Sequence, residues 1–87
     1  MEYTIDTVKT LNVFRDRIRA YKTAIEQADS LARLHHILEG YGKLLEEWKY
    51  ASELLVDLDC FLDVLKITRK LFEVNAISKE KFQELIK

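Results

Sequence analysis

The sequence predicts an all-α helical bundle in which two long helices form an antiparallel hairpin and a short C-terminal helix follows. The 87 residues contain no proline and only two glycines, so few positions force the chain to turn. No segment alternates apolar and polar residues with the period of two that marks a strand. Apolar residues instead recur at intervals of three and four, which is typical of amphipathic helices in a bundle.

The first helix is expected to begin at Thr4 and to continue as far as the two glycines. The Thr4 hydroxyl can cap the first turn, and Tyr3 and Val8 occupy the positions of a hydrophobic staple. Asp29 and Ser30 both favour N-cap positions, so a break there remains an alternative. The predicted apolar side of this helix consists of Leu11, Phe14, Ile18, Tyr21, Ile25 and Ala28.

The predicted turn lies at Gly40 and Gly42, because glycine readily adopts the left-handed conformation that ends helices. A second helix is expected over residues 43–74, with Asn75 as its stop signal. Ser78 would then begin the short C-terminal helix. In the second helix the residues predicted to face the first are Leu44, Trp48, Ala51, Leu55, Leu58, Leu62, Leu65 and Phe72.

Antiparallel pairing of these two apolar series gives one consistent register. It places Ile18 opposite Leu65 and Ile25 opposite Leu58, and the neighbouring layers follow in step. Only Arg69 interrupts the apolar layers. The register therefore favours a coiled-coil-like hairpin within one domain that covers residues 1–87.

A second apolar series lies on another side of the predicted second helix, and a helix that is apolar around most of its circumference needs several neighbours. A helix over residues 43–74 would also be about 48 Å long, whereas a compact chain of this size is about 30 Å across. We therefore expect a homo-oligomer, most simply a dimer. Its interface is predicted to contain Leu54, Phe61, Val64, Ile67, Leu71 and Val74.

Composition argues against several classes of protein. The 14 basic and 15 acidic residues give a formal net charge of −1, so no overall attraction to nucleic acid or to an anionic membrane is expected. A single cysteine rules out an internal disulfide framework. No uncharged apolar segment approaches the length of a membrane span. These features predict a cytoplasmic protein without a membrane contact.

Arg15, Arg19 and Lys22 form a basic stripe at helical spacing, and such a stripe can contact phosphates. A nucleic-acid-binding regulator that uses this stripe is one alternative function. Asp16 and Glu26 lie close to the stripe and reduce its positive charge, so nucleic acid is the less favoured partner.

Acidic residues lie one helical turn apart in two places, at Glu53 with Asp57 and at Asp59 with Asp63. Because paired carboxylates can hold a hard cation such as Mg²⁺, a small all-α enzyme with a carboxylate metal site is a second alternative. A solvent-exposed acidic side of the helix accounts for the same pattern. The favoured interpretation has no metal and no cofactor.

The other reactive side chains also favour structural roles. His35 and His36 point about 100° apart on a helix and cannot easily share a metal ion. Cys60 has apolar neighbours and no adjacent base, which favours burial over catalysis. The sequence thus predicts a non-enzymatic adaptor, regulator or inhibitor that presents a helical surface to a second copy and to a protein partner whose identity is open.

Overall fold

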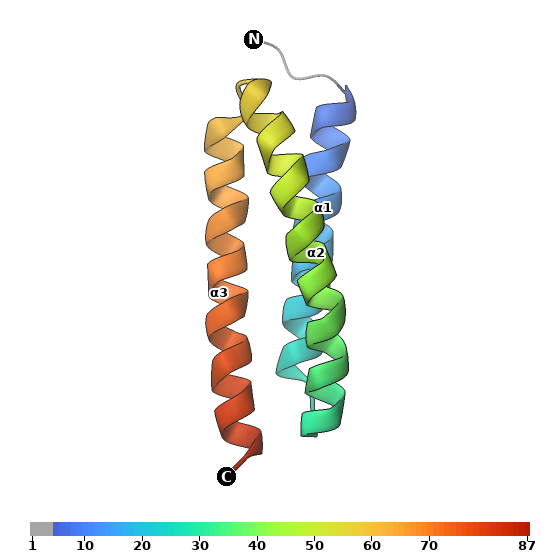
Figure 1. Ribbon diagram of the computed structural model, residues 1–87, viewed down its shortest axis with the longest axis vertical. Coiled ribbons are helices and arrows are strands. Elements are labelled where there is room, and N and C mark those ends of the chain that lie inside the picture. Colours follow the sequence, from blue (N-terminus) through green and yellow to red (C-terminus); the bar gives the residue numbers. More distant parts are fainter. Residues whose placement is uncertain (1–4) are drawn as a thin grey trace.

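The computed structural model describes residues 5–87 as three helices, α1 (Ile5–Glu26), α2 (Leu31–Asp57) and α3 (Phe61–Leu85). Each helix packs against the other two, and the described residues contain no strand. The predicted all-α helical bundle is therefore confirmed. The bundle is a rod with extents of 50 × 17 × 17 Å (Figure 1). None of the helices in this described part is long and apolar enough to span a membrane.

Aromatic contacts establish that α1 and α2 are antiparallel. Phe14 packs edge-on against Trp48 with ring centroids 5.0 Å apart, and Tyr21 packs similarly against Tyr41 at 5.7 Å. Residue numbers thus rise along α1 while they fall along the facing side of α2. The chain reverses once more before α3, so α3 runs parallel to α1 (Figure 1). The predicted hairpin of two long helices is wrong, and an up-down-up bundle of three similar helices replaces it.

The first reversal of the chain lies at residues 27–30. Ser30 has an extended backbone, with φ −150° and ψ 157°, and its Oγ accepts a hydrogen bond from the Arg33 backbone N–H at 3.1 Å. This is the geometry of an N-cap, which satisfies a donor in the first turn of α2. The break at Asp29 and Ser30, which the sequence left open as an alternative, is therefore the one that occurs.

The second reversal is centred on Asp59, whose φ of 62° lies in the left-handed region. The Cys60 N–H donates to the Leu55 carbonyl at 2.9 Å, and the Asp59 N–H donates to the Val56 carbonyl at 3.0 Å. These two hydrogen bonds form a Schellman motif, in which glycine usually occupies the left-handed position. Aspartate tolerates this conformation better than most residues. The turn therefore forms without the glycine that would have marked it in the sequence. The helix predicted over residues 43–74 is consequently wrong.

Gly40 and Gly42 lie inside α2, and neither has a positive φ, so the turn predicted there does not exist. Close packing explains Gly40, because a Cβ at this position would lie 2.7 Å from the Tyr21 Oη. The missing side chain therefore lets the Tyr21 ring approach the backbone of α2. A Cβ on Gly42 would meet no atom within 4 Å.

We expect Gly42→Ala to raise the free energy of unfolding by about 1 kcal/mol, because alanine loses less backbone entropy in a helix interior. Urea denaturation followed by circular dichroism measures this change. Gly40→Ala is the matched comparison, and its gain should be smaller or reversed because the Tyr21 hydroxyl must move. A destabilised Gly42→Ala protein would contradict an uninterrupted α2.

The C-terminal part of α3 also differs from the expectation, because the helix continues without a stop at Asn75 or a restart at Ser78. The Ser78 Oγ donates to the Val74 carbonyl at 2.8 Å, so the hydroxyl is satisfied inside the helix and does not cap a new one. At the other end of the chain, the expected cap Thr4 and staple residue Tyr3 lie outside the described residues.

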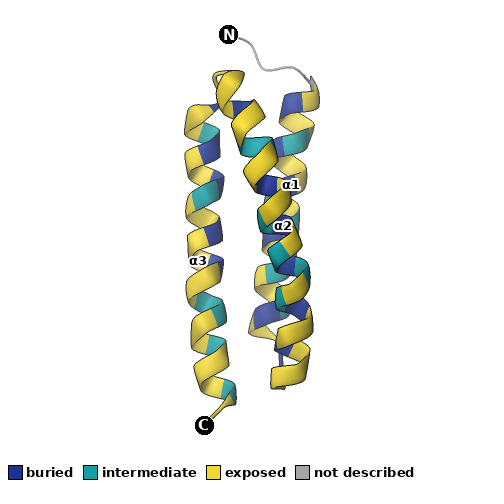
Figure 2. Cartoon of the chain, viewed as in Figure 1, coloured by how far each residue is buried: buried dark blue, intermediate teal, exposed yellow. Residues whose placement is uncertain are grey.

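The core uses the side of α3 opposite to the predicted one (Figure 2). Residues predicted to face the first helix are exposed: Leu58, Leu62, Leu65 and Phe72. Four residues predicted for an interface between copies are buried inside the monomer: Val64, Ile67, Leu71 and Val74. The turn at Asp59 explains the exchange, because it separates the apolar period of α2 from that of α3. The predicted interface is therefore wrong at these four positions. Its other two residues, Leu54 and Phe61, are exposed.

Tyr41 links α2 to α3 in the core, where its hydroxyl donates to the Leu71 carbonyl at 3.0 Å. Burial raises the pKa of Tyr41 from 10.0 to about 12. The unfolded chain therefore releases this proton near pH 10, while the folded protein keeps it until about pH 12. The contribution of Tyr41 to stability is complete below pH 10 and is lost as the pH rises towards 12.

We expect the unfolding free energy of the native protein to fall by about 2 kcal/mol more than that of Tyr41→Phe between pH 10 and pH 12. Urea titrations at several alkaline pH values measure the difference. Tyr50→Phe is the matched control because Tyr50 is 70% exposed, and its pH dependence should equal that of the native protein. An equal fall of the unfolding free energy in all three proteins would contradict the raised pKa of Tyr41 as its cause.

Candidate interaction surface

The side of α3 that faces away from the other two helices is exposed (Figure 2), and several of its exposed residues are large and apolar. Leu62, Leu65 and Phe72 have 70%, 48% and 67% of their surface exposed. Together with the exposed Arg69 and Ala76, they follow a spacing of three, four, three and four residues. This spacing lines up side chains along one side of a helix, as in the contact side of a coiled coil. We call these five residues the outer row of α3.

Further apolar residues lie around the turn between α2 and α3. Leu54, Val56, Leu58 and Phe61 are each between 42% and 66% exposed. Single exposed apolar residues are normal on protein surfaces, whereas several close together more often mark an interaction site. Together with Leu62 and Leu65, these residues concentrate exposed apolar side chains at the end of the bundle where α2 meets α3.

One flank of the outer row carries two opposite charges. Lys66 and Glu73 are both exposed, and they lie seven residues apart, which places them on the same side of α3. Within residues 5–87, neither side chain forms an ion pair. Glu73 also lines a hollow between α1 and α3 that Arg19, Lys22 and Lys70 border, so its carboxylate has cationic neighbours within the monomer.

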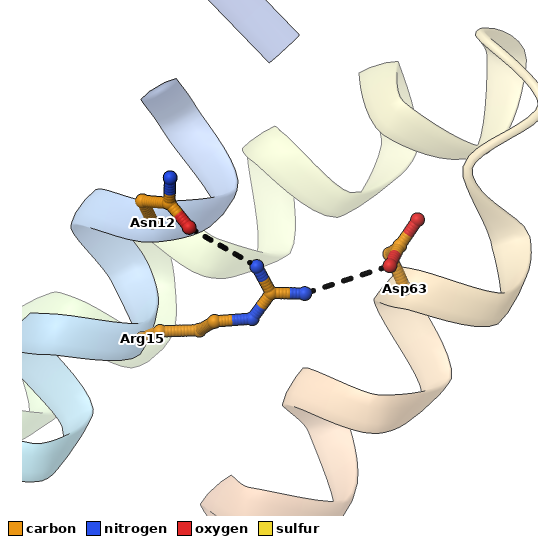
Figure 3. Close-up of polar contacts among 3 residues, drawn as sticks. All are labelled: Asn12, Arg15 and Asp63. Carbon is orange, nitrogen blue, oxygen red and sulfur yellow. Dashed lines mark hydrogen bonds and ion pairs between the residues drawn. The ribbon is translucent and has the colours of Figure 1, made fainter. Parts of the chain in front are cut away.

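Arg15, the first residue of the predicted basic stripe, makes contacts inside the bundle. Its guanidinium donates to the Asn12 Oδ1 at 3.2 Å and to the Asp63 Oδ1 at 3.5 Å (Figure 3). Asp63 lies in the first turn of α3 and is partly buried. The contact therefore ties α1 to α3 and leaves Arg15 less available to an external phosphate.

All three residues of the stripe line this hollow of about 140 Å³ between α1 and α3. The structure adds Lys70 from α3 to the same hollow, and Glu73 also lines it and reduces its positive charge. Sequence reasoning missed Lys70 as a companion of the stripe, because only the parallel packing of α1 and α3 brings the two helices together. The predicted nucleic-acid contact stays a prediction.

The acidic residues do not gather into one site. Among the described residues, no group of three or more His, Cys, Asp and Glu side chains is placed to hold a metal ion. Asp63 contacts Arg15, and Glu47 pairs with Arg17 of α1. The His35 Nε2 lies 3.1 Å from the Glu39 Oε1 on the surface of α2. Cys60 is a buried free thiol, which agrees with the packing role expected for it.

Comparisons of the chain with protein-family models, with curated proteins and with solved structures found no match. The chemistry of the chain's own surface is therefore the evidence on its function. Among the described residues, the outer row of α3 is the feature that departs furthest from an ordinary solvated helix, since its large apolar side chains lie where water-facing residues are expected.

Proposed function

We propose that this protein is a non-enzymatic helical interaction module that self-associates, most simply as a dimer, through the outer row of α3. The observation that carries the proposal is the exposure of Leu62, Leu65 and Phe72 along one side of a well-formed helix. Removing such side chains from water contributes about 1.5–3 kcal/mol for each one that becomes fully buried. A second copy supplies the same row, so the two rows can cover each other across a two-fold interface.

A dimer of this kind would present two copies of the remaining helical surface on one particle. That property suits an adaptor, a regulator or an inhibitor that acts on another protein in the cytoplasm. The carboxylates of the described residues are dispersed, so they give no comparable support to the alternative with a carboxylate metal site.

Sedimentation velocity of the native chain from micromolar to millimolar concentrations tests the proposal. We expect the mass to rise with concentration towards twice 10.3 kDa. A mass of 10.3 kDa at every concentration would overturn self-association.

A nucleic-acid-binding regulator is the second candidate, and the convergence of Arg19, Lys22 and Lys70 on one hollow favours it. Four basic residues and one carboxylate line the hollow, and the net positive charge provides a place for a backbone phosphate. A gel shift with random duplex and single-stranded DNA at low salt tests this candidate. Binding that weakens in the double variant Arg19→Glu and Lys22→Glu would support it, and absence of binding to either DNA would exclude it.

A further inference from the structure

We propose that two copies of the chain pair through α3 in an antiparallel orientation, about a two-fold axis that passes beside Arg69. This inference rests on the proposed self-association and adds its orientation and register. Two observations carry it, namely the near symmetry of the outer row about Arg69 and the position of Lys66 and Glu73 on its flank.

The apolar residues of the outer row complement each other in this arrangement. Leu65 and Phe72 lie four and three residues from Arg69 on opposite sides, so an antiparallel pair places Leu65 against the partner's Phe72. In the same way, Leu62 meets the partner's Ala76, which joins a large side chain to a small one. Each contact occurs twice, because residue i meets residue j and residue j meets residue i across a two-fold axis. All the exposed apolar side chains of the row are thereby covered.

The charges on the flank agree with the same register. In an antiparallel two-fold pair, a given flank of one helix lies beside the same flank of the other. Lys66 of one copy then faces the partner's Glu73, and Glu73 faces the partner's Lys66. Neither residue forms an ion pair among the described residues of the monomer, so pairing breaks no ion pair, although it draws Glu73 away from the cations of the hollow beside it. Two opposite-charge pairs at the rim select the register more than they add to affinity.

Other arrangements of the same two helices lose this complementarity. A shift of one heptad in one direction places Lys66 opposite the partner's Lys66, and a shift in the other direction places Glu73 opposite the partner's Glu73. A parallel pair brings the Lys66 flank beside the opposite flank, where Thr68 and Asn75 carry no charge. Like charges in direct opposition are destabilising, so the register centred on Arg69 is favoured.

Arg69 itself acquires a role in this arrangement. It is exposed and forms no ion pair within residues 5–87, although it interrupts an otherwise apolar row. A single polar residue in the contact row of a coiled coil specifies register at a cost in stability. In the dimer, the two Arg69 side chains meet beside the axis, where their like charges oppose association, and Glu73 one turn further along each helix offsets part of this cost. Any other register would place Arg69 against an apolar layer.

A charge exchange tests the orientation and the register. Lys66→Glu places two glutamates opposite each other at both sites, and Glu73→Lys places two lysines there. We expect each variant alone to raise the dissociation constant of the homodimer by about tenfold. An equimolar mixture of the two variants restores opposite charges across the interface, so heterodimers should form with nearly native affinity. The double variant Lys66→Glu and Glu73→Lys should also regain nearly native affinity. Sedimentation velocity measures all these constants.

Lys49→Glu is the matched control, because it makes the same charge change at an exposed position on α2, away from the outer row. Its dissociation constant should equal that of the native chain. Unchanged circular dichroism shows that the variants remain folded, as expected for substitutions at exposed positions. A monomeric native chain would overturn the proposed function and this inference together. A dimeric native chain whose single variants are unaffected, or whose mixture is not restored, would overturn the inference alone.

Discussion

Phe72→Ala is expected to weaken the dimer by about a hundredfold while the bundle stays folded. Phe72 is 67% exposed in the monomer, so its removal costs little intramolecular packing. In the proposed dimer its ring covers the partner's Leu65, and the substitution removes one such ring from each copy. Truncation of a central aromatic residue in an interface costs about 2–4 kcal/mol, which corresponds to a factor of about 30 to 1,000. Alanine also has a higher helix propensity than phenylalanine, so α3 should not be weakened.

Sedimentation velocity together with urea denaturation separates association from folding in this experiment. Phe82→Ala is the matched control, because Phe82 is 49% exposed on the same helix but borders a hollow beside Leu34 and Leu38 of α2. Its loss should leave the dissociation constant unchanged. A Phe72→Ala protein that still dimerises with native affinity would show that the outer row of α3 is not the interface.

Trp48→Ala is expected to remove about 3–5 kcal/mol from the free energy of unfolding. Trp48 is 5% exposed and packs against Phe14 of α1, while its Nε1–H donates to the Thr68 Oγ1 of α3 at 3.3 Å. One side chain on α2 therefore contacts both of the other helices. A domain of this size has a total stability of about 4–13 kcal/mol, so the loss is a large share of the whole. We expect the variant to be partly unfolded at room temperature.

Urea denaturation followed by far-ultraviolet circular dichroism measures this loss. Trp48→Phe keeps a ring against Phe14 but lacks the donor to Thr68, and its loss should be about half as large. Tyr50→Ala, at a 70% exposed position two residues further along α2, should change stability by less than about 0.5 kcal/mol. A Trp48→Ala protein with a native denaturation midpoint would contradict the central position of this residue.

The apolar side of α1 could be predicted because it depends on local periodicity alone. Five of the six residues assigned to it are buried in the structure: Leu11, Phe14, Ile18, Ile25 and Ala28. Tyr21, the sixth, is partly buried against the core. Within one uninterrupted helix, a spacing of three and four residues identifies the buried side, whatever the helix packs against. The apolar spacing predicts the buried side of α1 because the helix has no break from Ile5 to Glu26.

The positions of the turns could not be read from residue preferences. Gly40 is a strong turn signal by type, yet it lies in a helix because the Tyr21 ring needs the space of its missing side chain. Asp59 is a weaker signal, yet it adopts the left-handed conformation because the backbone hydrogen bonds of Cys60 and its neighbours hold it there. The outcome at Gly40 depends on a contact with a residue distant in the sequence, whereas the turn at Asp59 is held by hydrogen bonds within its own last helical turn.

The outer row of α3 was likewise only partly predictable from the sequence. The sequence reveals that residues 54–74 carry two apolar series, and that one short chain cannot cover both. It does not reveal which series faces the core, since both have helical spacing. The turn at Asp59 decides this, because it directs Ile67 and its series inward and leaves Leu65 and Phe72 outside.

By itself, the sequence determines that this protein is helical and that it has more apolar surface than a monomer of its size can bury. Those properties follow from composition and from periodicity, which act within a few turns of chain. Only the tertiary structure decides that the helices number three in the described part, that α1 and α3 are parallel, and that the side of α3 with Arg69 faces outward. These properties depend on where the chain reverses, and the packing of Tyr21 against Gly40 and the capping hydrogen bonds around Asp59 decide this against the stronger turn signal of glycine.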